Sequence, residues 1–248
     1  MSPPLPVLTA LELAAGAIPA DVLARRLRPV AARPPGTLVV HEVYRSLQGE
    51  STYAGLPCTF VRLTACHLRC NYCDTAHAFN QGEALPVADV LARALATGDD
   101  LVEITGGEPL LQAEVHDLVA RLLDAGRTVL LETSGAVGTA EVDPRVVVIL
   151  DVKTPGSGEA ATNVDANYPR LRPHDEVKYV VSSRADFDWS VAHIRAHAIH
   201  HRAKVLMGAV FGRVDPTELA AWVLATGLPI RFQLQLHKVL WAPDARGV

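Results

Sequence analysis

Short runs of aliphatic and β-branched residues recur along the chain from residue 38 onward, and stretches compatible with helices separate most of them. We expect strands at residues 38–44, 58–63, 101–105, 128–132, 146–151, 177–181, 205–210 and 230–234. Helices are expected at residues 87–96, 114–125, 187–200 and 216–225. Alternation of strand and helix predicts an α/β fold with a mostly parallel sheet and crossover helices, in the form of an open or closed barrel. Active sites in barrels of this kind collect at the C-terminal ends of the strands.

The N-terminal part of the chain has a different composition, rich in Ala, Pro and Arg. Residues 8–28 can form one amphipathic helix, and the Arg33-Pro34-Pro35-Gly36 sequence then ends it. We therefore predict an N-terminal helical extension, residues 1–36, that docks on a main domain of residues 37–248 or frays. A transit peptide is the alternative, which the acidic Glu12 and Asp21 disfavour.

Composition excludes several classes of protein. The 248 residues are 49% hydrophobic and 20% charged with a formal charge of −4, so no broad basic field is available to bind nucleic acid. Aromatic residues make up 5% of the chain, which disfavours base-stacking platforms. Apolar stretches are too short for a membrane span. We expect a protein that binds neither nucleic acid nor a membrane.

Cysteines mark the candidate chemistry. Cys66, Cys70 and Cys73 form a C-x3-C-x2-C run after a predicted strand, whereas Cys58 stands apart. This clustering is typical of metal ligands in a reducing compartment, so we expect a cytoplasmic protein. Three thiolates can hold a [4Fe–4S] cluster and leave one iron open. A zinc loop completed by His67 or His77, and buried thiols without a metal, are the alternatives.

The C-x3-C-x2-C run resembles the signature of the radical S-adenosylmethionine superfamily, and the Gly106-Gly107-Glu108-Pro109 turn resembles its second motif. This resemblance implies a partial (β/α) barrel with a [4Fe–4S] cluster on Cys66, Cys70 and Cys73, and S-adenosylmethionine as cofactor. The residues that it assigns to the cofactor are Tyr72, Cys73, Asp74, Gly107, Glu108, Ser134 and Lys153.

A narrower resemblance covers residues 38–240 and rests on segments 44–50, 70–75, 132–135, 151–155 and 235–238. Together these segments resemble the 7-carboxy-7-deazaguanine synthase family. That family converts 6-carboxy-5,6,7,8-tetrahydropterin to 7-carboxy-7-deazaguanine with release of ammonia, in 7-deazapurine (queuosine) biosynthesis. The substrate-binding residues that the resemblance implies are Leu47, Gln48, Gly49, Glu50, Arg62 and Thr105.

The same resemblance implies that Thr75 binds Mg²⁺, that a flavodoxin or ferredoxin-like protein donates the electron, and that the enzyme is a homodimer. One departure is Ser51, which stands where the family pattern usually has glycine. A glycyl-radical activase is a second function within the superfamily, and a zinc-stabilised binding module without catalysis is one outside it.

Histidines in the predicted helix at 187–200 form a further motif. His193, His197 and His200 would share one helical face, which could hold zinc. The pattern lacks an accompanying acidic residue, so we interpret it as a solvated face or one packed on a neighbouring subunit.

Overall fold

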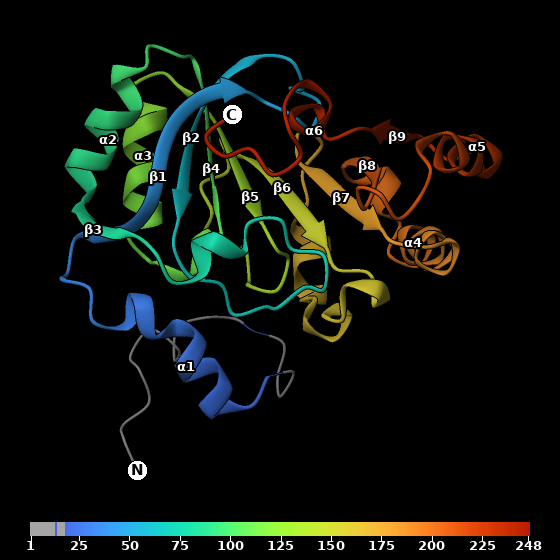
Figure 1. Ribbon diagram of the computed structural model, residues 1–248, viewed down its shortest axis with the longest axis horizontal. Coiled ribbons are helices and arrows are strands. Elements are labelled where there is room, and N and C mark those ends of the chain that lie inside the picture. Colours follow the sequence, from blue (N-terminus) through green and yellow to red (C-terminus); the bar gives the residue numbers. More distant parts are fainter. Residues whose placement is uncertain (1–12, 14–17) are drawn as a thin grey trace.

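The computed structural model describes residue 13 and residues 18–248 (Figure 1). The N-terminal helix, α1, runs from Ala20 to Ala31 and begins directly after Pro19, which has an extended backbone conformation (φ −57°, ψ 140°). The prediction of one helix over residues 8–28 is wrong at Leu13, which forms a β-bridge with Val137. Residues 8–12 and 14–17 of that prediction lie outside the described residues.

The described residues form a sheet of nine strands in the order β3-β1-β2-β4-β5-β6-β7-β8-β9. Strand β1 pairs antiparallel with β2 and β3, and all other pairs are parallel. The strands are β1 (Thr37–Leu47), β2 (Pro57–Leu63), β3 (Glu83–Pro86), β4 (Leu101–Gly106), β5 (Thr128–Thr133), β6 (Val147–Val152), β7 (Glu176–Val181), β8 (Lys204–Ala209) and β9 (Ile230–Gln233). The sheet curves without closing, which confirms the predicted partial barrel (Figure 1).

Helices precede β4, β5, β8 and β9 and cover the outside of the curved sheet, whereas β5 joins β6 without a helix and only short 3-10 turns join β6 to β7 (Figure 1). They are α2 (Val87–Ala96), α3 (Val115–Asp124), α4 (Arg184–Ala196) and α5 (Pro216–Thr226), followed by the short α6 (Leu236–Leu240). In the part of the chain that the structure describes, no helix is long and apolar enough to cross a membrane. The sequence missed β3, an edge strand of four residues in which Leu85 alone is buried.

The predicted helix at 187–200 is wrong at its C-terminal end. Helix α4 stops at Ala196, because Ala198 adopts a left-handed conformation (φ 50°) that ends the helical path. His200 therefore lies outside the helix, and the three histidines do not share a helical face. His193 is packed inside: its Nδ1 lies 2.9 Å from the Tyr179 hydroxyl and its Nε2 lies 3.1 Å from the Tyr168 hydroxyl.

Successive side chains of the parallel strands point alternately to the outer and the inner face of the sheet, and the two faces have different environments. On β4, Val102 and Ile104 point outward into the main core under the helices, whereas Glu103 and Thr105 line the inner pocket. A second, smaller apolar cluster fills the base of the barrel, and its members are Cys58, Phe60, Leu101, Leu130, Val147 and Ile149. The inner face is thus apolar at one end and charged at the other, where the strands end.

Gln112 joins the antiparallel edge to the parallel sheet. This fully buried amide accepts from the Val39 N–H at 2.7 Å and donates to the carbonyls of Val39 and Thr64, each at 3.1 Å. One side chain therefore bonds to three buried backbone groups, of which the Val39 carbonyl also accepts from the Thr64 N–H at 2.9 Å.

Gln112→Ala is expected to lower the free energy of unfolding by about 3 kcal/mol, because it leaves the buried Val39 N–H and Thr64 carbonyl without their partner. Urea denaturation of both proteins measures the loss. Gln81→Ala, which truncates an exposed glutamine, is the matched control and should leave stability unchanged. Equal stabilities of the two variants would contradict the bridging role.

Candidate active site

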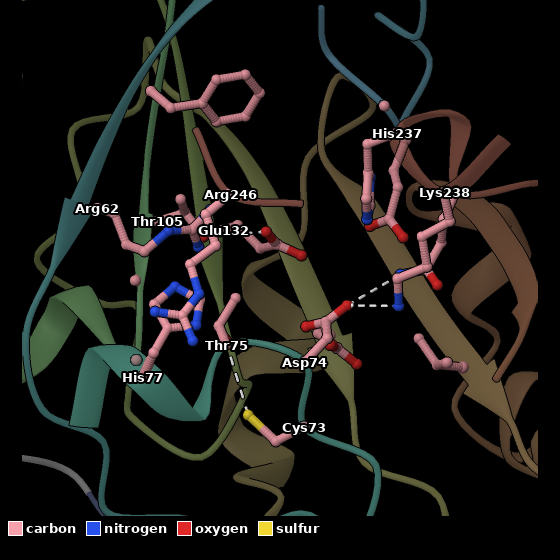
Figure 2. A pocket seen from close by; sticks show the side chains of 18 of the residues that line it. Arg62, Cys73, Asp74, Thr75, His77, Thr105, Glu132, His237, Lys238 and Arg246 are labelled. Atoms are coloured by element: carbon pink, nitrogen blue, oxygen red, sulfur yellow. Dashed lines mark hydrogen bonds and ion pairs between the residues drawn. The ribbon is translucent and has the colours of Figure 1, made fainter. Parts of the chain in front are cut away.

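A cavity of about 360 Å³ opens at the C-terminal ends of the parallel strands. Figure 2 shows Arg62, Thr75 and His77 on one side of it and His237 and Lys238 on the other. Every residue that the sequence assigned to a site lines this cavity, with one exception, Glu108. The structure therefore brings together residues that are more than 100 positions apart in the chain.

The three clustered cysteines lie on the loop that leaves β2. Cys66 is buried, and Cys70 and Cys73 are half-buried. Burial raises the pKa of the Cys66 thiol to about 12 and that of Cys70 to about 11, so both stay protonated until a metal displaces the proton. Cys58 packs instead in the apolar base of the barrel, away from this loop.

Backbone contacts hold the first turn of the cysteine loop. The N–H groups of Gly107 and Glu108 donate to the carbonyls of Leu63 and Ala65, at 3.1 and 2.9 Å. A Cβ atom at Gly107 would lie 2.2 Å from the Ala65 carbonyl oxygen, so only glycine allows this approach. The glycine motif at the end of β4 therefore supports the cysteine loop directly.

The thiols suit a multi-iron cluster better than a single zinc ion. A tetrahedral zinc ion with bonds of about 2.3 Å would hold its sulfurs about 3.8 Å apart. Within the described residues, Cys66, Cys70 and Cys73 do not form a group whose three sulfurs all lie within 4.8 Å of one another. This spread fits thiolates that bind different irons of one cluster.

Glu108 lies beneath the cavity. Its fully buried carboxylate accepts from the Leu110 N–H at 3.0 Å, the Thr133 hydroxyl at 2.9 Å and the Ser134 N–H at 2.8 Å, and also from the Ser134 hydroxyl. Hydrogen-bond donors of the protein therefore already bind this carboxylate. Its bonds to Ser134 position that residue at the cavity wall. The expectation that Glu108 binds the cofactor stays a prediction.

Opposite charges meet on the cavity floor around Lys178. The ammonium donates to Glu50 at 2.8 Å and to Glu132, and lies 3.8 Å from Asp151. Burial alone would lower the pKa of Lys178, but these carboxylates raise it well above its ordinary value. Lys153 forms a second ion pair with Asp151 at 2.8 Å. Sequence reasoning missed Lys178, because a lysine within an apolar strand has no motif around it.

Among the described residues, Glu103 on this floor forms no ion pair with a cationic side chain. It accepts a hydrogen bond from Gln48 Nε2 at 2.6 Å, and Gln48 Oε1 accepts from the Glu50 N–H at 2.6 Å. Burial and the nearby Glu132 carboxylate raise the pKa of Glu103 to about 8. At neutral pH Glu103 is therefore mostly protonated. Glu132 differs, because the Lys178 ammonium lowers the pKa of Glu132 below its ordinary value although burial opposes this effect.

Arg62 reaches the cavity from β2 with part of its guanidinium already paired. Its Nε donates to Glu42 at 2.8 Å and one terminal nitrogen donates to the Tyr44 hydroxyl at 2.9 Å. His77 lies beside His41, with ring centroids 5.0 Å apart, and these two rings and Glu42 group together rather than with the cysteines. Burial and the charges of Arg246 and Arg62 lower the pKa of His77. This corner of the cavity is cationic.

Thr75 and Thr105 present hydroxyls to the same cavity. Thr75 Oγ1 lies 3.7 Å from Cys73 Sγ, which places it beside the cysteine loop (Figure 2). Thr105 donates to Glu132 at 3.1 Å from the end of β4. Tyr72 also lines the cavity, and its hydroxyl donates to the Val180 carbonyl at 3.1 Å.

The C-terminal segment closes one side of the cavity. The Leu236 N–H donates to Gly49 O at 2.9 Å, and a Cβ at Gly49 would lie 2.8 Å from His237 Nδ1. Lys238 pairs with Asp74 at 2.8 Å, and its charge lowers the pKa of Asp74 despite the opposing effect of burial (Figure 2). Sequence reasoning noted the 235–238 segment without a role, and it did not anticipate that residues 243–248 also line the cavity.

Ser51, the departure from the family pattern, adopts the left-handed conformation that glycine favours (φ 65°). Its N–H donates to Gln233 Oε1 at 2.9 Å and its hydroxyl accepts from the Tyr53 N–H at 3.0 Å. These two bonds offset the strain of a side chain at this angle, so the loop keeps its shape without glycine.

Comparison with known proteins agrees with this geometry. Residues 61–151 match the model of the Radical SAM superfamily. QueE from Escherichia coli has the same fold, with a TM-score of 0.66 over 79% of this chain and 94% of QueE, at 22% identity. A radical SAM fold thus carries the cysteine loop and the cavity.

Two relatives narrow the assignment. The 7-carboxy-7-deazaguanine synthase of Chlorobaculum tepidum is 45% identical over 85% of this chain and 97% of its own length. The enzyme of the same name from Koribacter versatilis is 44% identical over 84% of this chain and 99% of its own length. The chain belongs to the 7-carboxy-7-deazaguanine synthase family.

The raised pKa of Glu103 predicts a pH-dependent stability. Between its ordinary pKa of 4.5 and the native value of about 8, the native state retains a proton that the unfolded chain releases. The free energy of unfolding should therefore fall as pH rises through this window, and Glu103→Gln should remove that part of the fall.

Denaturant unfolding at pH 5.5, 7 and 8.5 tests this expectation. The stability of Glu103→Gln relative to the native sequence should increase with pH. Glu218→Gln, on the exposed face of α5, is the control and should follow the native curve. Parallel curves for Glu103→Gln would show that Glu103 ionises normally.

Proposed function

We propose that this protein is a radical S-adenosylmethionine lyase that converts 6-carboxy-5,6,7,8-tetrahydropterin to 7-carboxy-7-deazaguanine and releases ammonia. The observation that carries this proposal is the shared cavity. The cysteine loop borders it on one side, and the Leu47–Glu50 turn with the C-terminal segment borders it on the other. Family membership supports the same activity.

The residues present fit the cofactors that this chemistry needs. Cys66, Cys70 and Cys73 would hold a [4Fe–4S] cluster with one open iron. When bound, the cluster and S-adenosylmethionine supply the radical that abstracts hydrogen from the substrate. The cofactor-binding residues proposed are Tyr72, Cys73, Asp74, Gly107, Glu108, Ser134 and Lys153.

Asp151 adds support for a polar ligand beside the cysteines. Its Oδ2 pairs with Lys153, whereas its Oδ1 is buried and has no hydrogen-bond partner among the described residues. A buried acceptor without a donor is costly, and a bound hydroxyl or ammonium group would satisfy it.

The substrate would lie against the charged floor. Gln48 would read the edge of the pterin together with Leu47, Gly49 and Glu50, and Thr105 would contact the substrate from β4. Arg62 suits the substrate carboxylate, because Glu42 and Tyr44 fix the plane of its guanidinium and so reduce the entropy lost on binding. Protonated Glu103 holds the Gln48 amide in orientation.

Magnesium is part of the proposal. Thr75 would supply one oxygen ligand to Mg²⁺, which keeps most of its coordination sites for water and substrate. We further propose a cytoplasmic homodimer with a flavodoxin or ferredoxin-like electron donor. Its radical SAM domain spans residues 37–248 and follows an N-terminal extension of residues 1–36.

An anaerobic assay of the reconstituted protein tests the function. With 6-carboxytetrahydropterin, S-adenosylmethionine and a strong chemical reductant, we expect ammonia and 7-carboxy-7-deazaguanine in equal amounts, with about four irons per chain. Cys70→Ala should abolish turnover, and Cys58→Ala should retain it. One zinc per chain, or cofactor cleavage without ammonia release, would overturn the cluster or the substrate assignment respectively.

Thr75→Ala should make the enzyme less responsive to Mg²⁺, because a lost oxygen ligand shifts the substrate relative to the radical. A misplacement of about 1 Å can cost on the order of a hundredfold in rate. The measurement is the ratio of activities with and without Mg²⁺, at matched iron content. Full stimulation of the variant would place the cation elsewhere.

A further inference from the structure

Helix α1 of the N-terminal extension contacts the cysteine loop. Arg26 donates from a terminal guanidinium nitrogen to the backbone carbonyl of His67, the residue after Cys66. The same nitrogen lies 3.9 Å from Glu159 Oε1. In Figure 1, α1 lies below the barrel, next to the loops that follow the strands.

Glu159 completes this contact from another part of the chain. Its Oε1 also accepts a hydrogen bond from the Arg69 N–H, the residue before Cys70, at 2.6 Å. Arg26 and Glu159 thus hold the backbone of the cysteine loop at two points between its first two thiols. Both side chains are largely buried, with 20% and 12% exposure, so water competes weakly with these bonds.

Apolar contacts from the extension cover the same loop. Ile18 packs against the cluster of buried residues formed by Cys66, Leu68 and Ala136. Leu13 forms its β-bridge with Val137, directly after Ala136. Leu27 and Val30 of α1 are buried in the main core, which fixes the helix in place.

About one seventh of this chain has no counterpart in the two relatives described above. They match 84–85% of this chain over 97–99% of their own length. The unmatched share is about the length of the extension, 36 of 248 residues.

We propose that the N-terminal extension is a working part of the metal site in this chain: Arg26 is a positioning residue that fixes the loop between Cys66 and Cys70, and Ile18 shields it from solvent. Only the effect of Arg26 on the metal depends on the proposed [4Fe–4S] cluster, which is part of the proposed function. The positioning of the loop is independent of the cluster and can be measured without it.

Hydrogen exchange of the metal-free protein tests the positioning. In Arg26→Ala, exchange of the Leu68 and Arg69 amides should accelerate on the order of tenfold, the factor for one charge-assisted hydrogen bond lost from the closed loop. Arg26→Lys, which keeps the charge, should restore part of the protection. Arg25→Ala, on the exposed side of α1, is the matched control and should exchange like the native protein.

The reconstituted protein tests the consequence for the metal. Visible absorption of the cluster should bleach in air several-fold faster in Arg26→Ala than in Arg25→Ala. The midpoint potential of the cluster should become more negative in Arg26→Ala but not in Arg26→Lys, because a nearby positive charge stabilises the reduced cluster. Glu159→Gln, which removes the ion pair and keeps the acceptor for Arg69, should bleach at an intermediate rate.

Identical amide exchange in Arg26→Ala and Arg25→Ala would overturn the inference, even if the protein binds four irons and turns over. A native protein that binds no iron would instead overturn the proposed function, and the exchange result would still stand. Thermal unfolding of each variant confirms that it is folded before these comparisons.

Discussion

A single buried ammonium group organises the interior of this barrel. Lys178 meets Glu50, Glu132 and Asp151 on the cavity floor, and these acids come from the β1–β2 loop, β5 and β6. A buried charge of either sign is costly unless it is paired, so these groups must stay together. The position of the loop that carries Glu50 therefore depends on a strand far along the chain.

This dependence extends from the floor to both sides of the cavity. Gln48, two residues before Glu50, holds Glu103, and Gly49 accepts from the C-terminal segment. The C-terminal segment in turn reaches Asp74 beside the cysteine loop through Lys238. Loss of the Lys178 pairing would leave three carboxylates in one buried space and would loosen the cavity around both the metal and the substrate.

The hydrophobic pattern of the sequence was sufficient to predict the parallel strands and the helices between them, because each strand has an outward face that must be apolar. It could not reveal β3, whose four residues pair along an edge with little burial, or the end of α4 at Ala198, where an ordinary residue adopts a left-handed angle. The cysteine spacing predicted a metal site, and the three cysteines line the cavity. Lys178 and Glu103 could not be found in this way, since their chemistry arises only when separate strands face one another.

The cysteine loop shows why local sequence and long-range contacts must act together. Three thiols in eight residues indicate a metal site, but the loop has no helix or strand of its own between Cys66 and Cys73. Its backbone is held from outside, by Gly107 and Glu108 at the first cysteine, by Ser157 at Asn71, and by Glu159 at Arg69. A loop with so little internal structure takes its shape from its neighbours. A segment added to the N-terminus can therefore become part of the site by contacting backbone atoms alone.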